Sequence, residues 1–213
     1  MSGPLFRAQL QELRQAGWRS AELGIFASQR KGFDRRFSIT FDDGFSNVLK
    51  YALEPLRVAG FHAIQFIVAG RIGQQNVWDT SIGEAPEKLM DMGQIREWLA
   101  AGHEIGSHSL THPRLTQLAP EAAAEEIRAS KKQLEDTFGV PIRHFCYPYG
   151  DWNVWVREQV QNAGYTTACA TEFGVNSWSD SPYSLKRVTA RYRTRSLRAI
   201  GQWLRARLTP VFT

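Results

Sequence analysis

Short apolar runs alternate along the chain with longer segments in which apolar residues recur every three or four positions. The first pattern is typical of buried strands and the second of helices with one buried face. We therefore expect strands at residues 37–41, 63–70, 103–107, 143–147, 165–170 and 185–188. The helical pattern covers residues 46–59, 92–101, 120–139 and 153–163. The polar stretch 71–91 is too irregular to assign.

The chain begins with a pattern that predicts an amphipathic helix, MSGPLFRAQLQELRQAG. Ser2 is placed to cap this helix, and Pro4 suits its first turn. One face carries the apolar residues Leu5, Phe6, Leu10 and Leu13. A last helix is predicted after Ser196, with leucines and arginines on opposite sides. We expect that helix to close the fold, and a helix lying on a membrane surface is the sharper alternative.

The repeated alternation of strands and helices implies parallel strands joined by right-handed crossovers. Six or seven such strands form either a small barrel or a doubly wound sheet. No strand is followed by a GxGxxG or GxxxxGKS sequence, so the nucleotide-binding versions of these folds lose support. A barrel predicts that functional side chains gather where the strands end.

The composition fits one globular domain, expected over residues 1–213. Hydrophobic residues make up 43% of the chain, and no run of 18 apolar residues or signal-peptide pattern is found. As written, the sequence is expected to be cytoplasmic, with association at the inner membrane surface left open. Cys146 and Cys169 are expected to be buried thiols rather than a disulfide.

The formal net charge is +5, and much of the excess comes from basic residues after position 185. A basic segment can bind anionic lipid, acidic glycan or nucleic acid. No nucleic-acid-binding motif accompanies it, so we expect a solvated helix face and no nucleic-acid partner. Peripheral membrane contact through the last helix remains the alternative.

Polar clusters directly follow three of the predicted strands. Asp42 and Asp43 follow the first strand, His108 and His112 the third, and Tyr149 the fourth. Two histidines four residues apart can bind one metal ion from a single helical turn, and two histidines with a carboxylate form a common zinc site. A second carboxylate can then accept a proton from water. Each cluster alone could be only a turn or a loop. Because all three follow strands, we expect them to converge on one catalytic site at the end of the barrel.

Three sequences carry a resemblance to a known family: TFDDG (40–44), GHEIGSHSLTHP (102–113) and YPYG (147–150). They resemble the first three motifs of the polysaccharide deacetylases, the NodB-homology enzymes of carbohydrate esterase family 4. The likeness extends over about residues 36–190. It implies an α/β fold of the distorted (β/α)7 barrel type, here with an N-terminal helix and a C-terminal closing helix.

The resemblance implies a role for each matched position. Asp43, His108 and His112 would bind the metal, and Asp42 would be the general base that activates water. The backbone N–H of Tyr149 would help to stabilise the oxyanion formed on an N-acetyl group. The metal would be a divalent ion, with zinc preferred, although such a site also accepts cobalt or nickel.

Two positions depart from the family pattern. Cys146 stands where many members carry an arginine that orients the base, and no histidine occurs after His144 to serve as the late general acid. Arg187 is the candidate substitute for that arginine, because its Leu-Lys-Arg-Val segment resembles a divergent branch that deacetylates exopolysaccharides. The acid is then either protonated Asp42 or a residue that the sequence does not identify.

Neighbouring side chains are further candidates. Trp152 and Pro148, at the YPYG turn, are expected to bind the sugar; the aromatic alternatives are Tyr147, Trp78 and Trp178. His103 and His144 begin strands and are expected to be structural.

The first functional hypothesis is metal-dependent hydrolysis of an N-acetyl group from an N-acetylhexosamine, which would release acetate. The substrate would be a polysaccharide, an oligosaccharide or a lipid-linked sugar. Two alternatives stay open: a deformylase or other small-amide hydrolase on the same fold, and a glycan-binding protein without turnover. The missing arginine and histidine favour a binding protein, whereas the presence of both aspartates and both metal-site histidines opposes it.

Overall fold

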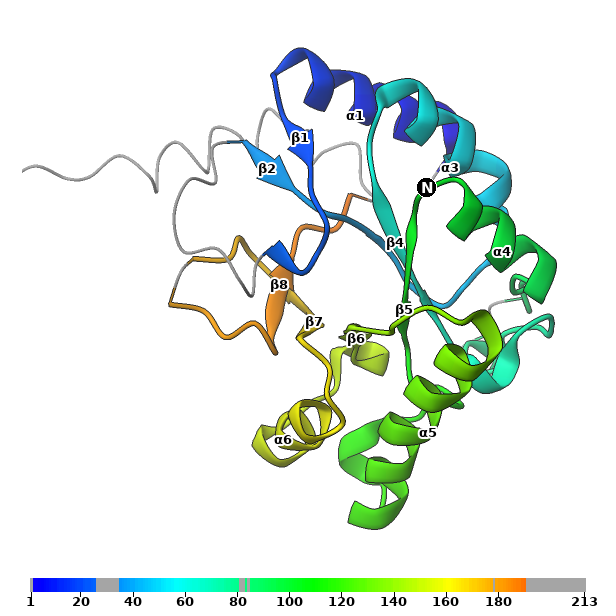
Figure 1. Cartoon of the computed structure of the whole chain (residues 1–213), viewed down its shortest axis with the longest axis vertical. Helices are drawn as coiled ribbons and strands as arrows, with labels where there is room; N and C mark the ends of the chain where they lie inside the picture. The colour runs from blue at the N-terminus through cyan, green and yellow to red at the C-terminus, as the bar shows by residue number, and fades with distance from the viewer. Residues whose placement is uncertain (1, 26–34, 81–82, 84, 178, 191–213) are drawn as a thin grey trace, which may run out of the picture.

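A curled parallel sheet forms the centre of the molecule. The structure is a computed structural model that describes residues 2–25, 35–80, 83, 85–177 and 179–190. Six strands follow one another across the sheet in chain order: β3 (Ile39–Phe41), β4 (Ala63–Ile67), β5 (Glu104–Ser107), β6 (His144–Cys146), β7 (Thr167–Phe173) and β8 (Leu185–Arg187). Each new strand is added on the same side as the one before. The sheet they form curls into a half-barrel (Figure 1).

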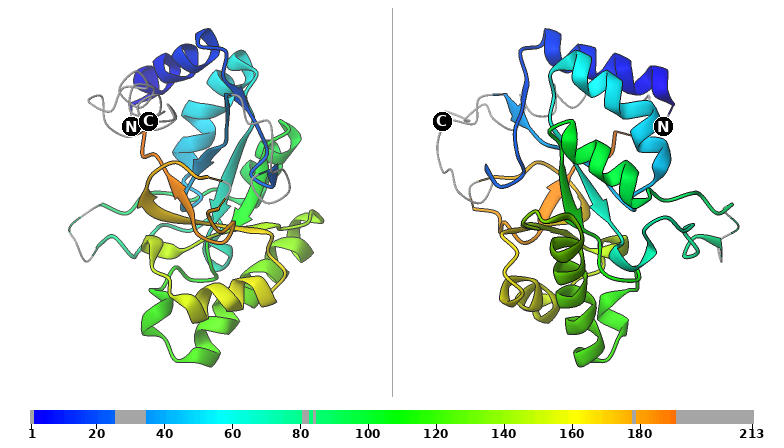
Figure 2. Two further views of the ribbon diagram at one scale, coloured as in Figure 1. Left: turned by 90° about the vertical axis from the view of Figure 1, so that its left-hand side faces the viewer. Right: turned by 45° about the vertical axis from the view of Figure 1, so that its right-hand side comes forward.

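Helices cover the outer face of this sheet (Figures 1 and 2). The described part of the chain contains α1 (Gly3–Gln15), α3 (Ser46–Ala59), α4 (Met92–Ala100), α5 (Pro120–Phe138) and α6 (Val154–Asn162). Short 3-10 turns lie between these elements: η1 (Ala69–Arg71) after β4, η3 (Leu115–Gln117) before α5 and η4 (Pro148–Gly150) after β6. A second sheet of two parallel strands, β1 (Arg19–Ser20) and β2 (Arg36–Phe37), precedes β3. No helix in the described ranges combines the length and apolar surface that a membrane span needs.

Several helix ends follow the signals read from the sequence. Asp91 caps α4 through a capping box, and the side chain of Asn153 caps α6 as predicted. Helix α5 ends at Gly139, whose φ of 67° is left-handed. Pro4 lies in the first turn of α1, but the predicted side-chain cap by Ser2 is wrong. Proline has no N–H, so Pro4 removes one of the donors that such a cap would bind.

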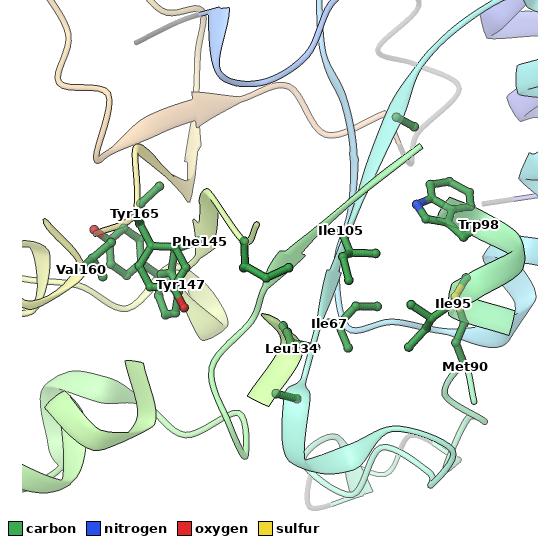
Figure 3. Close-up of a cluster of buried hydrophobic side chains, with 14 of the residues drawn as sticks. Ile67, Met90, Ile95, Trp98, Ile105, Leu134, Phe145, Tyr147, Val160 and Tyr165 are labelled. Carbon is green, nitrogen blue, oxygen red and sulfur yellow. The ribbon is translucent and has the colours of Figure 1, made fainter. Parts of the chain in front are cut away.

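Two hydrophobic clusters pack against opposite faces of the sheet. The larger one fills the space between the sheet and the helices, where Trp98 of α4, Leu134 of α5 and Phe145 of β6 are completely buried (Figure 3). The smaller one consists of Leu23, Ile64, Phe66, Cys146, Cys169 and Leu185. Neighbouring residues of one strand join different clusters because side chains alternate across a sheet. The inner face of the half-barrel is therefore apolar near its centre, and the polar groups lie at the strand ends.

The predicted α/β fold with a curled parallel sheet and an N-terminal helix is confirmed. The main sheet has six strands in the described residues rather than the seven of the predicted barrel, and β3 and β8 are its edges. The predicted closing helix lies beyond residue 190, outside the described residues. That the whole chain forms one domain, with its motif-bearing core at about 36–190, stays a prediction.

Candidate active site

The carboxyl ends of β3, β5 and β6 bring the three sequence motifs together. Asp43 Oδ1 lies 3.4 Å from His108 Nε2 and 3.3 Å from His112 Nε2. The donor atoms of these three residues all lie within 4.8 Å of one another. Parallel strands place their carboxyl ends at the same edge of the sheet, which is why residues 65 positions apart meet here. These three residues form the candidate metal group.

The ring of His108 is fixed by a second contact. Its Nδ1 lies 2.7 Å from the carbonyl oxygen of Cys146, and the side chain is buried. A carbonyl oxygen only accepts hydrogen bonds, so Nδ1 carries a proton, and Nε2 is the ring nitrogen that faces Asp43. A carbonyl partner on the other ring nitrogen is typical of metal-binding histidines.

The two histidines do not share a helical turn, although their spacing of four residues would allow one. After β5 the chain forms a loop in which Ser109 and His112 have left-handed φ angles of 64° and 69°. His112 precedes Pro113, and a proline disfavours the right-handed helical conformation of the residue before it. The His112 N–H donates instead to Ser109 Oγ at 3.0 Å. This bend brings the ring centroids of His108 and His112 to 4.8 Å.

Asp43 is placed by an unusual turn of its own. Asp43 and Gly44 both have left-handed φ angles, 71° and 79°, and they turn the chain sharply after β3. Although burial opposes ionisation, hydrogen bonds with His108 and His112 hold the pKa of Asp43 well below its usual range. One carboxylate and two imidazoles are a donor set that suits Zn²⁺, Co²⁺ or Ni²⁺. The residues present therefore fit a divalent cation.

Asp42 forms an ion pair with Arg187 beside this group. Arg187 Nη1 donates to Asp42 Oδ1 at 2.7 Å, and Nη2 donates to Oδ2 at 2.8 Å. The same guanidinium donates from Nε to the carbonyl of Ala170 at 2.8 Å and from Nη1 to Thr40 Oγ1 at 3.1 Å. Burial raises the pKa of Asp42, but the charge and hydrogen bonds of Arg187 outweigh this and hold it below its usual range. A second carboxylate is thus kept ionised next to the candidate metal group.

The side chain of Cys146 lies beside the ion pair of Asp42 and Arg187. Its Sγ is 3.6 Å from Asp42 Oδ1 and 3.3 Å from Arg187 Nη2. Burial raises the pKa of this thiol, so it is neutral, donates weakly to Asp42 and accepts from Arg187. Both predicted thiols are free and buried. Cys146 and Cys169 lie opposite each other in the backbone pairing of β6 with β7. Arg187 reaches Asp42 from β8, past the small side chain of Cys146.

The third motif forms one wall of the site. Tyr149 has a left-handed φ of 59°, and its ring meets that of His112 edge-on with centroids 4.6 Å apart. Pro148 is buried in η4. Trp152 stacks on Tyr147 at 6.1 Å and packs against the larger hydrophobic cluster. The sugar-binding roles of Trp152 and Pro148 stay predictions, and Trp178 lies outside the described residues.

Trp78 contacts the site in a way that the sequence did not indicate. Its indole stacks on the imidazole of His112, with ring centroids 4.3 Å apart and an interplanar angle of 25°. Trp78 lies in the irregular stretch 71–91, which is tied to the turn after β3 by a hydrogen bond from Met90 N to Gly44 O at 2.7 Å. This segment has no periodic pattern that would indicate where its side chains point.

Comparisons with known proteins agree on a family. The sequence pattern described as polysaccharide deacetylase matches residues 29–168. The chain is 26% identical over 187 residues to YxkH of Bacillus subtilis strain 168, a match that covers 86% of this chain and 63% of that protein. It is 27% identical over 128 residues to the peptidoglycan-N-acetylglucosamine deacetylase PgdA of Listeria monocytogenes, covering 60% of this chain and 24% of PgdA. The chain thus spans less than two thirds of either relative.

The fold is also similar to a solved structure. IcaB from Ammonifex degensii superposes with a TM-score of 0.82 at 22% sequence identity, over 94% of this chain and 88% of that one. At this identity the likeness concerns the fold, and it places the described half-barrel among known architectures.

Proposed function

The chain belongs to the polysaccharide deacetylase family, and on this premise we propose that it hydrolyses the N-acetyl group of an N-acetylated sugar with the help of a divalent metal ion. One observation carries the proposal: two aspartates that follow each other in sequence face two different sets of partners. Asp43 faces His108 and His112, and Asp42 faces Arg187. One carboxylate is thus available to hold a cation, and the other is held ionised to accept a proton.

Asp43, His108 and His112 would hold the metal. When bound, a divalent cation supplies Lewis-acid chemistry, because it lowers the pKa of water and polarises a carbonyl oxygen. Asp42 would accept the proton of the water that attacks the acetyl carbonyl, and Arg187 would keep its carboxylate oriented and ionised. The N–H of Tyr149 would donate to the oxygen that becomes negatively charged, a contact of this kind typically contributing about 3 kcal/mol.

Hydrolysis then requires a proton for the departing amine. The C–N bond breaks, the carbonyl carbon keeps the oxygen of water, and the sugar nitrogen must be protonated to leave as an amine. A carboxyl group whose pKa is lowered by Arg187 gives up a proton readily once it has accepted one. We assign both transfers to Asp42, because no histidine follows His144 in the chain.

The substrate is proposed to be a polymer, oligomer or lipid-linked form of an N-acetylhexosamine. The peptidoglycan-N-acetylglucosamine deacetylase of Listeria monocytogenes and a chitooligosaccharide deacetylase of Azorhizobium caulinodans, 34% identical over 82 residues, are named for substrates of this class. All such substrates share the N-acetyl amide that Asp42 and the candidate metal group would face. We propose zinc as the resident metal, since the donor set suits it.

The test is acetate release from N-acetylglucosamine oligomers by metal-stripped protein reloaded with zinc or cobalt. Release that depends on the metal and falls by about 100-fold or more in Asp42→Asn would support the proposal and the role of Asp42. Metal binding without release from acetylated or lipid-linked sugars, but with release of formate from formyl amides, would favour a deformylase. Glycan binding with no turnover of any amide would favour a binding protein. Failure to bind a divalent ion would overturn the metal assignment.

A further inference from the structure

A carboxylate on the outer helix α5 binds the loop that carries the two histidines. We propose that Glu126 is a positioning residue that fixes the loop 108–112 and thereby sets the affinity of the candidate metal group for a divalent cation. The inference rests on the proposed function, because it assumes that Asp43, His108 and His112 bind the metal. It concerns a residue that lies outside all three sequence motifs.

Glu126 makes three hydrogen bonds to the peptide between the histidines. Its Oε2 accepts from the backbone N–H of Leu110 and from that of Thr111, both at 2.9 Å. Its Oε1 accepts from Thr111 Oγ1 at 2.6 Å. Hydrogen bonds to an ionised acceptor are stronger than those between neutral groups. One side chain of α5 thus satisfies two consecutive amides of the loop.

The opposite side of the loop is held by η1, which follows β4. The N–H of Ala69 donates to the carbonyl of Ser109 at 3.1 Å, and the N–H of Gly70 donates to that of Leu110 at 2.8 Å. A β-carbon at Gly70 would lie 2.7 Å from the carbonyl oxygen of Leu110, so this close approach requires glycine. The loop is therefore clamped between α5, which binds its N–H groups, and η1, which binds its carbonyls.

The loop needs such a clamp because its backbone is strained. Ser109 and His112 both have left-handed φ angles, which cost side-chain-bearing residues free energy and persist only where the surroundings enforce them. Leu110 and Thr111, the two residues that Glu126 binds, lie between these positions. Without the carboxylate, the loop would gain freedom to relax, and His112 Nε2 would leave its position 3.3 Å from Asp43 Oδ1.

Two other polar residues of α5 anchor the helix against the same region. Ser130 Oγ lies 2.8 Å from Ser107 Oγ, in the residue before His108. Gln133 Nε2 donates to the carbonyl of Ala69 at 2.8 Å. Glu126, Ser130 and Gln133 are spaced by four and three residues and so share one face of the helix. This face holds α5 in register with both the loop and η1.

The experiment measures the dissociation constant of Co²⁺ or Zn²⁺ by competition with a chelator, for the full chain and three variants. Glu126→Ala is expected to weaken metal binding by about 10- to 100-fold, as changes to the residues that support metal ligands typically do. Glu126→Gln should restore most of the affinity, because its amide oxygen can still accept from both N–H groups. Glu125→Ala is the matched control: this neighbouring residue is exposed, and within the described residues it forms an ion pair with Arg128 on the same helix.

The free energy of unfolding of each metal-free variant separates positioning from general stability. A purely structural role would lower the free energy of unfolding of Glu126→Ala and leave the metal dissociation constant unchanged, which would overturn the proposal. If Glu126→Ala fails to fold, Glu126→Asp, which keeps the charge but shortens the side chain, should show the weaker metal binding. Equal affinity in Glu126→Asp and the unmodified chain would also overturn it. Failure of the proposed function is a different result, in which the unmodified chain binds no metal or Asp43→Ala binds it equally well.

Discussion

Two carboxylates in this molecule each lie between two histidines, at opposite ends of the sheet. Asp43, after β3, faces His108 and His112 at 3.4 and 3.3 Å. Glu104, at the start of β5, faces His62 and His144, each at 3.7 Å. The residue types are the same at both ends, yet of these two groups only the one around Asp43 brings its donor atoms within 4.8 Å of one another. The other group in the described chain that does so, Asp42, His108 and Cys146, shares His108 with it.

The difference lies in which oxygen the histidines face. Both histidines of the first group approach the same oxygen, Oδ1 of Asp43. In the second group His62 approaches Oε2 of Glu104 and His144 approaches Oε1, so the two rings lie on different sides of the carboxylate. A cation needs donors that point to one position, and only the first arrangement supplies it.

The two ends also differ in how a ring is oriented. A backbone carbonyl, which can only accept, fixes the protonated nitrogen of His108. His144 Nδ1 instead meets the hydroxyl of Thr167 at 2.8 Å, and a hydroxyl can donate or accept. The backbone thus fixes a ring tautomer in the candidate metal group through His108, whereas the partner of His144 is a hydroxyl that leaves the tautomer of His144 open.

The strongest test of this comparison removes each carboxylate in turn. Asp43→Ala should weaken Co²⁺ or Zn²⁺ binding by more than about 100-fold, beyond the usual effect of changing a supporting residue. Glu104→Ala, at the far end of the sheet, should change the dissociation constant by less than about twofold. Competition titration with a chelator measures both. Comparable losses in the two variants would show that the ends are not functionally different.

Removal of Arg187 should give the next largest effect, because the site end depends on a second, ionised carboxylate. Arg187→Met leaves Asp42 without its cation and should lower kcat by about 100-fold, while metal affinity changes little. Arg187→Lys keeps the charge but not the paired hydrogen bonds, so its kcat should lie between those of Arg187→Met and the unmodified chain. Steady-state acetate release measures kcat and KM. Unchanged kcat in Arg187→Met would show that Arg187 does not orient Asp42.

His103, at the end opposite the site, should contribute to how stability depends on pH. Burial lowers the pKa of His103 to about 4, with a smaller contribution from His62, so the folded protein resists protonation there. The unfolded chain binds this proton at about pH 6.5. The contribution of neutral His103 to stability is therefore fully present above pH 6.5 and is lost as the pH falls toward 4. At pH 4.5 the loss should be about 2 kcal/mol, measured by urea unfolding. His103→Gln should remove this part of the pH dependence, and an unchanged slope would contradict the prediction.

The smallest effect should come from Trp78. Each end of the sheet has a histidine whose ring centroid is 4.3 Å from that of a tryptophan, His112 with Trp78 and His103 with Trp98. Trp78→Ala should weaken metal binding by about 3- to 10-fold, since aromatic pairs typically contribute about 1 kcal/mol. Trp98→Ala should leave metal affinity near that of the unmodified chain and instead lower the free energy of unfolding, because Trp98 is completely buried.

Local pattern was sufficient to predict the six strands of the main sheet and the described α-helices, but not the small sheet of β1 and β2. Alternating apolar segments gave the order of the elements, and Gly139 and Asn153 marked helix ends correctly. The clusters that follow the strands indicated which side chains would meet, because parallel strands share an edge. The sequence resemblance added the candidate pairing of Arg187 with Asp42, which lie within hydrogen-bonding distance.

The remaining features depend on backbone angles and on distant contacts. The spacing of His108 and His112 allowed either a helical turn or a loop, and left-handed angles at Ser109 and His112 produce the loop. Nothing in the local sequence distinguishes Glu126 from Glu125, since only the tertiary fold places one of them on the loop. Which of two adjacent acidic residues faces inward is decided by the packing of α5.

The contact between Arg187 and Asp42 has a consequence for how the protein is made. These residues are 145 positions apart, on the strand at one edge of the sheet and the turn beside the other edge. When β3 to β7 have emerged from the ribosome, every member of the candidate metal group has been made. Arg187, whose guanidinium pairs with Asp42, has not. On the proposed function, the nascent chain would thus acquire the ability to bind metal before it acquires the ability to hydrolyse an amide.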